Sequence, residues 1–170
     1  MFRVLVLGGQ GMLGHIVVKT LSRAQGFKIE YTVSADRNNP FYFNAKNGIN
    51  QLHKIIKTNG NFDYFINCIG VLSSNIDKRE SDSIRNAIVV NSLLPHDLAK
   101  LGHEFGIKVI HISTDAVFGS SAGLCFEDSL EFCEEIYGKT KSVGEVLSPN
   151  FLNIRCSIIG LSPFKKSGII

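Results

Sequence analysis

The 170-residue sequence has few cysteines, no long apolar stretch and no run of like charge. Its four cysteines show neither CxxC spacing nor histidine partners at metal-ligand distances, so we expect no metal site and buried, reduced thiols in a cytosolic protein. No apolar stretch is long enough to span a bilayer, and the N-terminal run MFRVLVLGG meets glycines at once, unlike a signal peptide. We therefore expect a cytoplasmic protein with no membrane partner.

Charge and composition further restrict the class of protein. The net charge of +3 comes from scattered lysines and arginines, which argues against a nucleic-acid partner. An apolar content of 44% and a charged content of 19% are typical of a globular domain. Without an internal repeat or linker, residues 1–170 are expected to form one domain.

Short apolar runs alternate regularly with helix-length segments. The expected strands are 3–8, 28–34, 62–70, 107–113 and 151–160. The expected helices are 12–26, 49–60, 81–106 and 137–147, the third with a kink or restart at Pro95. Apolar strands that alternate with helices predict an α/β fold with a Rossmann-like, doubly wound parallel sheet in three αβα layers. Ligands of such folds bind beyond the carboxyl ends of the strands.

The run VLVLGGQGMLGH places three glycines, Gly8, Gly11 and Gly14, between the first strand and the first helix. Glycines there allow the backbone to approach a pyrophosphate, whose charge the amides at the helix start, including those of Met12 and Leu13, can meet. A glycine-rich turn without a ligand is the alternative. The position at the strand-to-helix junction favours a dinucleotide site.

The second strand is followed by SADRN, where the adenosine ribose of a dinucleotide is expected. Asp36 is suited to accept a hydrogen bond from the ribose 2′-hydroxyl of NAD(H). Arg37 is equally suited to the 2′-phosphate of NADP(H), which the neutral hydroxyl of Ser34 would not repel. The pattern slightly favours NADP(H) and leaves NAD(H) open, and a solvated Arg37 remains the alternative.

Two Tyr and Lys pairs share the spacing i, i+4 that places side chains on one helix face. Tyr42 and Lys46 follow a proline in an aromatic run with β character, so we interpret that pair as packing. Tyr137 and Lys141 open a helix, and Thr114 follows the preceding strand. Together they predict a proton-transfer site in which Tyr137 is the general acid.

The roles of the three side chains follow from their chemistry. A phenol has an ordinary pKa near 10, which the Lys141 ammonium and a nicotinamide cation are expected to lower. Lys141 would also hold the cofactor ribose, and Thr114 would bind the substrate oxygen. An ordinary helix start with Thr114 as a cap is the alternative.

Five motifs carry a family resemblance: GGQGMLG, FINCIG, VNSLLPHDLAKLGHEFGIKVIHISTDAVFG, YGKTKSVGE and IRCSIIG. Together they resemble the extended short-chain dehydrogenase/reductases, most closely the dTDP-4-dehydrorhamnose reductase-like group. The resemblance implies NAD(P)H-dependent reduction of a nucleoside-diphosphate 4-keto-deoxysugar for cell-surface polysaccharides, and a possible homodimer. It makes Thr114, Tyr137 and Lys141 the catalytic residues. It adds six residues to the cofactor site: Asn44, Ala45, Cys68, Ile69, Gly70 and Asn91.

The sequence departs from this family in two respects and differs from the related dehydratases in a third. Asn44 stands where an aspartate is common near the adenine, and it keeps an acceptor oxygen. Asp115 and Ala116 replace the Asp-Glu pair of dehydratases, which favours simple reduction. The chain also ends before the expected substrate lobe. A non-catalytic subunit similar to the regulatory subunit of methionine adenosyltransferase, or an NAD-dependent sugar-nucleotide epimerase, are the alternatives.

Overall fold

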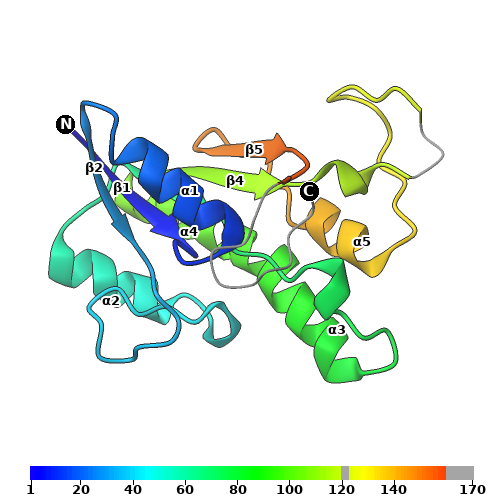
Figure 1. Ribbon diagram of the computed structural model, residues 1–170, viewed down its shortest axis with the longest axis horizontal. Coiled ribbons are helices and arrows are strands. Elements are labelled where there is room, and N and C mark those ends of the chain that lie inside the picture. Colours follow the sequence, from blue (N-terminus) through cyan, green and yellow to red (C-terminus); the bar gives the residue numbers. More distant parts are fainter. Residues whose placement is uncertain (120–122, 160–170) are drawn as a thin grey trace.

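The computed structural model describes residues 1–119 and 123–159. Its five strands form one fully parallel sheet in the order β2-β1-β3-β4-β5 (Figure 1). The strands are β1 (Phe2–Leu7), β2 (Phe27–Tyr31), β3 (Tyr64–Asn67), β4 (Lys108–Ser113) and β5 (Phe151–Arg155). The α-helices are α1 (Met12–Leu21), α2 (Asn50–Asn59), α3 (Ser81–Ala87), α4 (Leu94–Phe105) and α5 (Ile136–Val143). The predicted Rossmann-like α/β fold is confirmed.

A short bridge extends the sheet beyond β2. Val33 pairs in parallel with Tyr42, so the chain forms a rudimentary strand at this edge before it crosses to β3. With that bridge, the strand order is that of a dinucleotide-binding doubly wound sheet. The order reverses between β1 and β3, and this switch point is where such folds bind ligands.

Two apolar cores, one on each face, hold the helices to the sheet. Alternate residues of β1 pack into the two cores, because successive side chains of a strand point to opposite faces of the sheet. Leu5 and Leu7 face the larger core, to which α2 and α4 contribute, whereas Val4 and Val6 face the side chains of α1. Helices on both faces give the three-layer arrangement.

The α1 face of the sheet is only partly covered. On β5, Leu152 and Ile154 are 56% and 39% exposed, although both are apolar. Phe151, on the opposite face, is buried in the larger core. Among the described residues, the core on the α1 face therefore extends to Ile66 of β3 and leaves β5 exposed.

The segment predicted as one helix over 81–106 has three parts. A π-helical stretch, η3 (Ile88–Leu93), separates α3 from α4. Pro95 explains the break, because a proline has no N–H to donate to the carbonyl of Asn91, four residues earlier, and its ring crowds that carbonyl. The predicted restart at Pro95 is confirmed.

Other boundaries differ from the prediction. The strand expected over 62–70 ends at Asn67, and the one expected over 28–34 ends at Tyr31 before the bridge. The last strand ends at Arg155, and residue 160 lies outside the described residues. Each of these strands is thus shorter than the segment expected from the sequence.

The cysteines differ from the expectation in one respect. Cys68, Cys125, Cys133 and Cys156 are free, but each is partly accessible and none is fully buried. Over the two described ranges, no helix combines the length and the apolar character needed to cross a bilayer.

Candidate active site

The glycine loop between β1 and α1 is held by close backbone contacts. Gly8 has a φ of +78°, a conformation that favours glycine, and its N–H donates to the Thr32 hydroxyl at 2.9 Å. The N–H of Gly11 donates to the carbonyl of Gly8 at 2.9 Å. A Cβ on Gly14 would stand 2.1 Å from the same carbonyl oxygen. Gly8 and Gly14 therefore each have a geometric reason to be glycine, whereas a Cβ on Gly11 would stand 3.3 Å from that oxygen.

Gly9 was not among the predicted site residues. A Cβ on it would stand 2.5 Å from the Cβ of Tyr31, at the end of β2. The loop thus lies directly on the Tyr31 side chain. Its signal in the sequence was the pair of consecutive glycines, since the GxxGxxG spacing needs only the first of them.

The start of α1 fits a diphosphate. Gly11 is the N-cap, has no side chain to cap the first amides, and no acid occupies the first turn of α1. The first amides of a helix have no partner inside it and carry its positive partial charge, so an anion can be held there. The amides of Met12, Leu13 and Gly14 would hold the diphosphate of a dinucleotide.

The loop after β2 is open to solvent. Ser34, Asp36 and Arg37 are all exposed. One carboxylate oxygen of Asp36 accepts a hydrogen bond from the N–H of Asn38 at 3.0 Å, which leaves its other oxygen for a ligand. Both candidate ribose contacts, Asp36 and Arg37, therefore remain accessible.

The expected adenine contacts, Asn44 and Ala45, lie in a turn after the Tyr42 bridge. Asn44 caps the 3-10 helix η1 (Ala45–Asn47), and its side chain accepts from the N–H of Lys46. Ala45 packs against the larger core. Tyr42 belongs to the bridge and Lys46 to η1, so these two do not share a helix face, as expected from the sequence.

Residues after β3 border the glycine loop. The N–H of Cys68 donates to the carbonyl of Leu7 at 3.1 Å, and a Cβ on Gly8 would stand 2.9 Å from Cγ1 of Ile69. Burial raises the pKa of the Cys68 thiol to about 12, so it stays protonated. The structure thus brings the glycine loop, Cys68, Ile69 and Gly70 to the switch point between β1 and β3.

The three predicted catalytic residues meet beyond the carboxyl end of β4. Thr114 is buried directly after β4, and its hydroxyl accepts from the N–H of Ala116. Tyr137 lies in the first turn of α5, close to the Thr114 side chain. Lys141, also from α5, is 3% exposed and donates to the carbonyl of Ile112 at 2.6 Å.

A glycine missed by the sequence analysis brings α5 this close. A Cβ on Gly138 would stand 2.3 Å from the carbonyl oxygen of Ala116, in the 3-10 helix η4 (Asp115–Val117). Only glycine permits that approach of the two backbones. The contact fixes Tyr137 beside Thr114.

The electrostatics of the pair differ from the expectation. The pKa of Tyr137 is raised, mainly by burial and also by Asp115 and Cys156, while the nearby Thr114 hydroxyl lowers it. Lys141 is not among the groups that lower the Tyr137 pKa. The expectation that Lys141 lowers the pKa of this phenol is therefore wrong. Burial lowers the pKa of Lys141 itself to about 8.

Asn91, in η3, is fully buried and joins three segments. Its side-chain oxygen accepts from the N–H of Val71 at 2.8 Å. Its amide nitrogen donates to the carbonyl of Val71 at 3.0 Å and to the hydroxyl of Thr140 at 3.1 Å. Thr140 in turn donates to the carbonyl of Tyr137. Asn91 therefore connects the loop after β3 to the helix that carries Tyr137 and Lys141.

Arg155, at the end of β5, anchors the other side of α5. It forms ion pairs with Glu145, at 2.7 Å, and with Glu131, and its guanidinium lies over the Phe118 ring. The hydroxyl of Ser113 donates to Glu145. This cluster ties β4, β5 and the segment before α5 together around the site.

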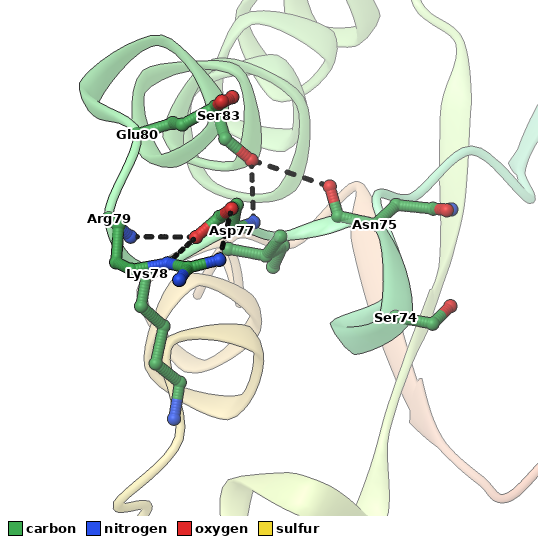
Figure 2. A pocket seen from close by; sticks show the side chains of 8 residues that line it. Ser74, Asn75, Asp77, Lys78, Arg79, Glu80 and Ser83 are labelled. Carbon is green, nitrogen blue, oxygen red and sulfur yellow. Dashed lines mark hydrogen bonds and ion pairs between the residues drawn. The ribbon is translucent and has the colours of Figure 1, made fainter.

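A surface hollow of about 670 Å³ lies beside the start of α3 (Figure 2). Its polar groups largely bond one another: Asp77 accepts from Arg79, and the Ser83 hydroxyl donates to the carbonyl of Asn75. Lys78 extends away from these groups and pairs with Glu135, which precedes α5, at 2.8 Å. None of the predicted site residues lines this hollow. We therefore place the candidate site at the switch point and the start of α5.

In the part of the chain that the structure describes, no three histidine, cysteine, aspartate or glutamate side chains gather as a metal site would require.

Comparison with known proteins supports the fold and gives the family. No curated protein sequence matches the chain. A dTDP-4-dehydrorhamnose reductase of Clostridium acetobutylicum matches with 24% identity and a TM-score of 0.72, over 90% of this chain and 52% of that one. A hypothetical dTDP-4-dehydrorhamnose reductase of Sulfolobus tokodaii matches with 26% identity and a TM-score of 0.75, over 94% and 57%.

A third structure, the dTDP-4-dehydrorhamnose reductase of Bacillus anthracis in complex with NADP, shares 22% identity at a TM-score of 0.74, over 91% of this chain and 52% of that one. The chain thus spans little more than half the length of these three relatives. The family model described as the RmlD substrate binding domain matches residues 2–159. That match covers nearly the whole chain, and the protein belongs to the RmlD substrate binding domain family.

Proposed function

We propose that the chain is the nucleotide-binding part of an NAD(P)H-dependent oxidoreductase, a reductase of a nucleoside-diphosphate 4-keto-deoxysugar used for cell-surface polysaccharides. One observation carries the proposal. Thr114, Tyr137 and Lys141 meet beyond the end of β4, at the same carboxyl edge of the parallel sheet as the glycine loop. A relative crystallised with NADP, and others named as sugar-nucleotide reductases, support this reading.

Residues of the chain would hold the nicotinamide dinucleotide in two places. The amides at the start of α1 would bind its diphosphate, and the loop with Ser34, Asp36 and Arg37 would bind its adenosine ribose. Arg37 favours NADP(H), because a guanidinium pairs well with a phosphate. When bound, the dinucleotide supplies the hydride for the reduction.

The chain's own side chains would handle the proton. A raised pKa keeps Tyr137 protonated at neutral pH, as a general acid must be before it gives its proton to the new alkoxide. Thr114 lies close to Tyr137 and would orient the carbonyl oxygen of the substrate. Lys141 lies one helical turn behind Tyr137, where its amine would hold the nicotinamide ribose and exchange a proton. Asp115 stands without the neighbouring glutamate of dehydratases, and Ala116 follows it, which supports reduction without loss of water.

Two further parts of the proposal concern the whole protein. Ile88, Leu93 and Val143 are apolar and 42%, 53% and 64% exposed, so we propose that the helical surface around η3 and α5 pairs with a second copy. Sedimentation velocity would show a dimer that Leu93→Glu disrupts. We also place the reaction in the cytoplasm, where the four free thiols stay reduced.

The direct test combines nucleotide binding and turnover. Calorimetry with NADPH and NADH should show binding of at least one of them to the purified chain. In a version of the protein that includes the expected substrate lobe, consumption of NADPH with dTDP-4-dehydrorhamnose should fall at least about 100-fold in Tyr137→Phe. Tyr42→Phe is the matched control, because Tyr42 has the same spacing to a lysine and should keep full turnover. The proposal fails if neither nucleotide binds, and the catalytic role fails if Tyr137→Phe keeps normal turnover.

A further inference from the structure

A continuous row of buried polar groups runs from β3 through β4 to Lys141. Asn67 and His111 are 0% exposed, and both interrupt otherwise apolar strands. The amide nitrogen of Asn67 lies 3.0 Å from Nδ1 of His111, and Nε2 of His111 lies 3.2 Å from Nζ of Lys141. Nζ also donates to the carbonyl of Ile112 at 2.6 Å. The row therefore ends at the amine of the candidate site.

The donor and acceptor roles along this row are fixed at Asn67, the end opposite Lys141. The backbone N–H of Ile69 donates to the side-chain oxygen of Asn67 at 3.1 Å. A flipped amide would put the NH₂ group against that N–H, donor against donor, so the oxygen must stay where it is. The NH₂ group of Asn67 consequently faces His111, and Nδ1 of His111 must accept.

The imidazole tautomer follows from this orientation. A ring that accepts at Nδ1 cannot be an imidazolium, and its single proton must be on Nε2. Burial is the largest cause that lowers the pKa of His111, to about 3, which agrees with a neutral ring. His111 therefore presents an N–H to Lys141.

An N–H aimed at Nζ discriminates between the two states of Lys141. An ammonium has three N–H donors and no lone pair, so it would meet the His111 proton with a proton of its own. A neutral amine accepts from His111 with its lone pair and still donates to Ile112. Every group in the row is then satisfied, as buried polar groups require.

We propose that Asn67 and His111 are positioning residues for Lys141: by directing an N–H at Nζ, they favour the neutral amine over the ammonium. The consequence for catalysis rests on the proposed function: Lys141 exchanges a proton near the working pH, whereas an ordinary lysine stays charged.

The other groups that face Lys141 act in the opposite direction. The Glu145 carboxylate raises its pKa, whereas Cys156 and Cys68 would do so only as thiolates, and burial outweighs these groups, so that the value falls to about 8. The His111 donor adds to the effect of burial. Lys141 is thereby balanced between groups that favour and groups that oppose its charge.

The test is nuclear magnetic resonance of the purified chain, which needs neither nucleotide nor turnover. Two-bond ¹H–¹⁵N correlation should show His111 as the neutral Nε2–H tautomer throughout the neutral range. The ¹³Cε signal of Lys141, assigned with Lys141→Arg, should titrate well below those of the exposed lysines. An Nδ1–H tautomer, an imidazolium, or a Lys141 that titrates with the surface lysines would overturn the proposal.

One substitution should exchange the donor and acceptor roles along the row. In Asn67→Asp, a carboxylate accepts from both Ile69 and His111, so the ring proton moves to Nδ1 and Nε2 becomes an acceptor for the ammonium. The Lys141 pKa should then rise by at least about one unit. Asn61→Asp is the control, because it adds the same charge at an exposed position and should leave Lys141 unchanged. An unchanged Lys141 in folded Asn67→Asp contradicts the proposal, and if that variant does not fold, the wild-type tautomer decides it. Failure of nucleotide binding would leave these spectra unaffected, so the two proposals fail separately.

Discussion

Gly138 and Ala116 touch backbone to backbone, with space for no side chain between the start of α5 and the carbonyl oxygen of Ala116. Gly138→Ala should push α5 away from η4 and separate Tyr137 from Thr114. We expect a loss of about 1–3 kcal/mol in the free energy of unfolding, together with a large loss of turnover. Urea unfolding measures the first, and Lys139→Ala, an exposed substitution on the same helix, is the control. A stable and active Gly138→Ala would show that the contact can relax.

Substitutions in the glycine loop should weaken nucleotide binding to different degrees. Gly14→Ala places a Cβ 2.1 Å from the carbonyl oxygen of Gly8, whereas Gly11→Ala places one at 3.3 Å, which a small shift can relieve. Nucleotide affinity should therefore fall by at least about tenfold in Gly14→Ala, equivalent to about 1.4 kcal/mol, and by less in Gly11→Ala. Calorimetric titration of both variants ranks them. Equal affinities would mean that the diphosphate does not lie on this loop.

Cofactor preference should depend on Arg37. Its guanidinium is exposed in the loop after β2, and loss of a charged hydrogen bond to a 2′-phosphate costs about 1.5–3 kcal/mol. Arg37→Ala should weaken NADPH binding by at least about tenfold and leave NADH binding nearly unchanged. Arg23→Ala, an exposed arginine after α1, is the matched control. If Arg37→Ala weakens neither nucleotide and Asp36→Ala weakens NADH, the site belongs to NAD(H).

Burial of Lys141 predicts a pH dependence of stability. Its pKa is about 8 in the folded chain against an ordinary value of 10.5, so between these values the unfolded chain binds more protons. Stability relative to Lys141→Met should therefore rise as the pH increases from about 8 toward 10.5, by a few kcal/mol at most. Lys46→Met, at an exposed position, should follow the wild type. Parallel wild-type and Lys141→Met curves over this range would show that Lys141 is charged without penalty.

Asn91 should contribute more to stability than its neighbour Asn86. Asn91→Ala leaves the N–H and the carbonyl of Val71 without their partner, which should cost about 2 kcal/mol or more. The side-chain oxygen of Asn86 is buried without a hydrogen-bond partner, so Asn86→Ala should change the free energy of unfolding by less than about 0.5 kcal/mol. Chemical unfolding of both variants is the measurement. Similar losses would mean that the Val71 loop finds other partners, including water.

Local patterns in the sequence were sufficient for the framework of the site. Alternating apolar strands and helices predicted the parallel sheet, the glycine spacing predicted the turn into α1, and Pro95 predicted the break before α4. Tyr137 could be separated from Tyr42 because one follows a helix start and the other follows a proline. These features depend on residues close together in the chain.

Features that depend on residues far apart in the chain could not be predicted from local sequence patterns. The contact of Gly138 with Ala116 and the row from Asn67 to Lys141 join segments that meet only in the folded sheet. The raised pKa of Tyr137 depends on burial, which the sequence does not show. A polar residue inside an apolar strand, such as His111 in VIHIS, was the one available signal of a buried network.

The strand order also bears on how the site assembles as the chain folds. Phe2 of β1 pairs with Phe27, but Val4 of the same strand pairs with Tyr64, far later in the chain. Pairings between distant residues form slowly, because a long loop must close first. The switch point beside the glycine loop lies between β1 and β3, so it cannot exist in an intermediate that contains only the first two strands. Nucleotide binding should therefore appear late in refolding, together with the centre of the sheet.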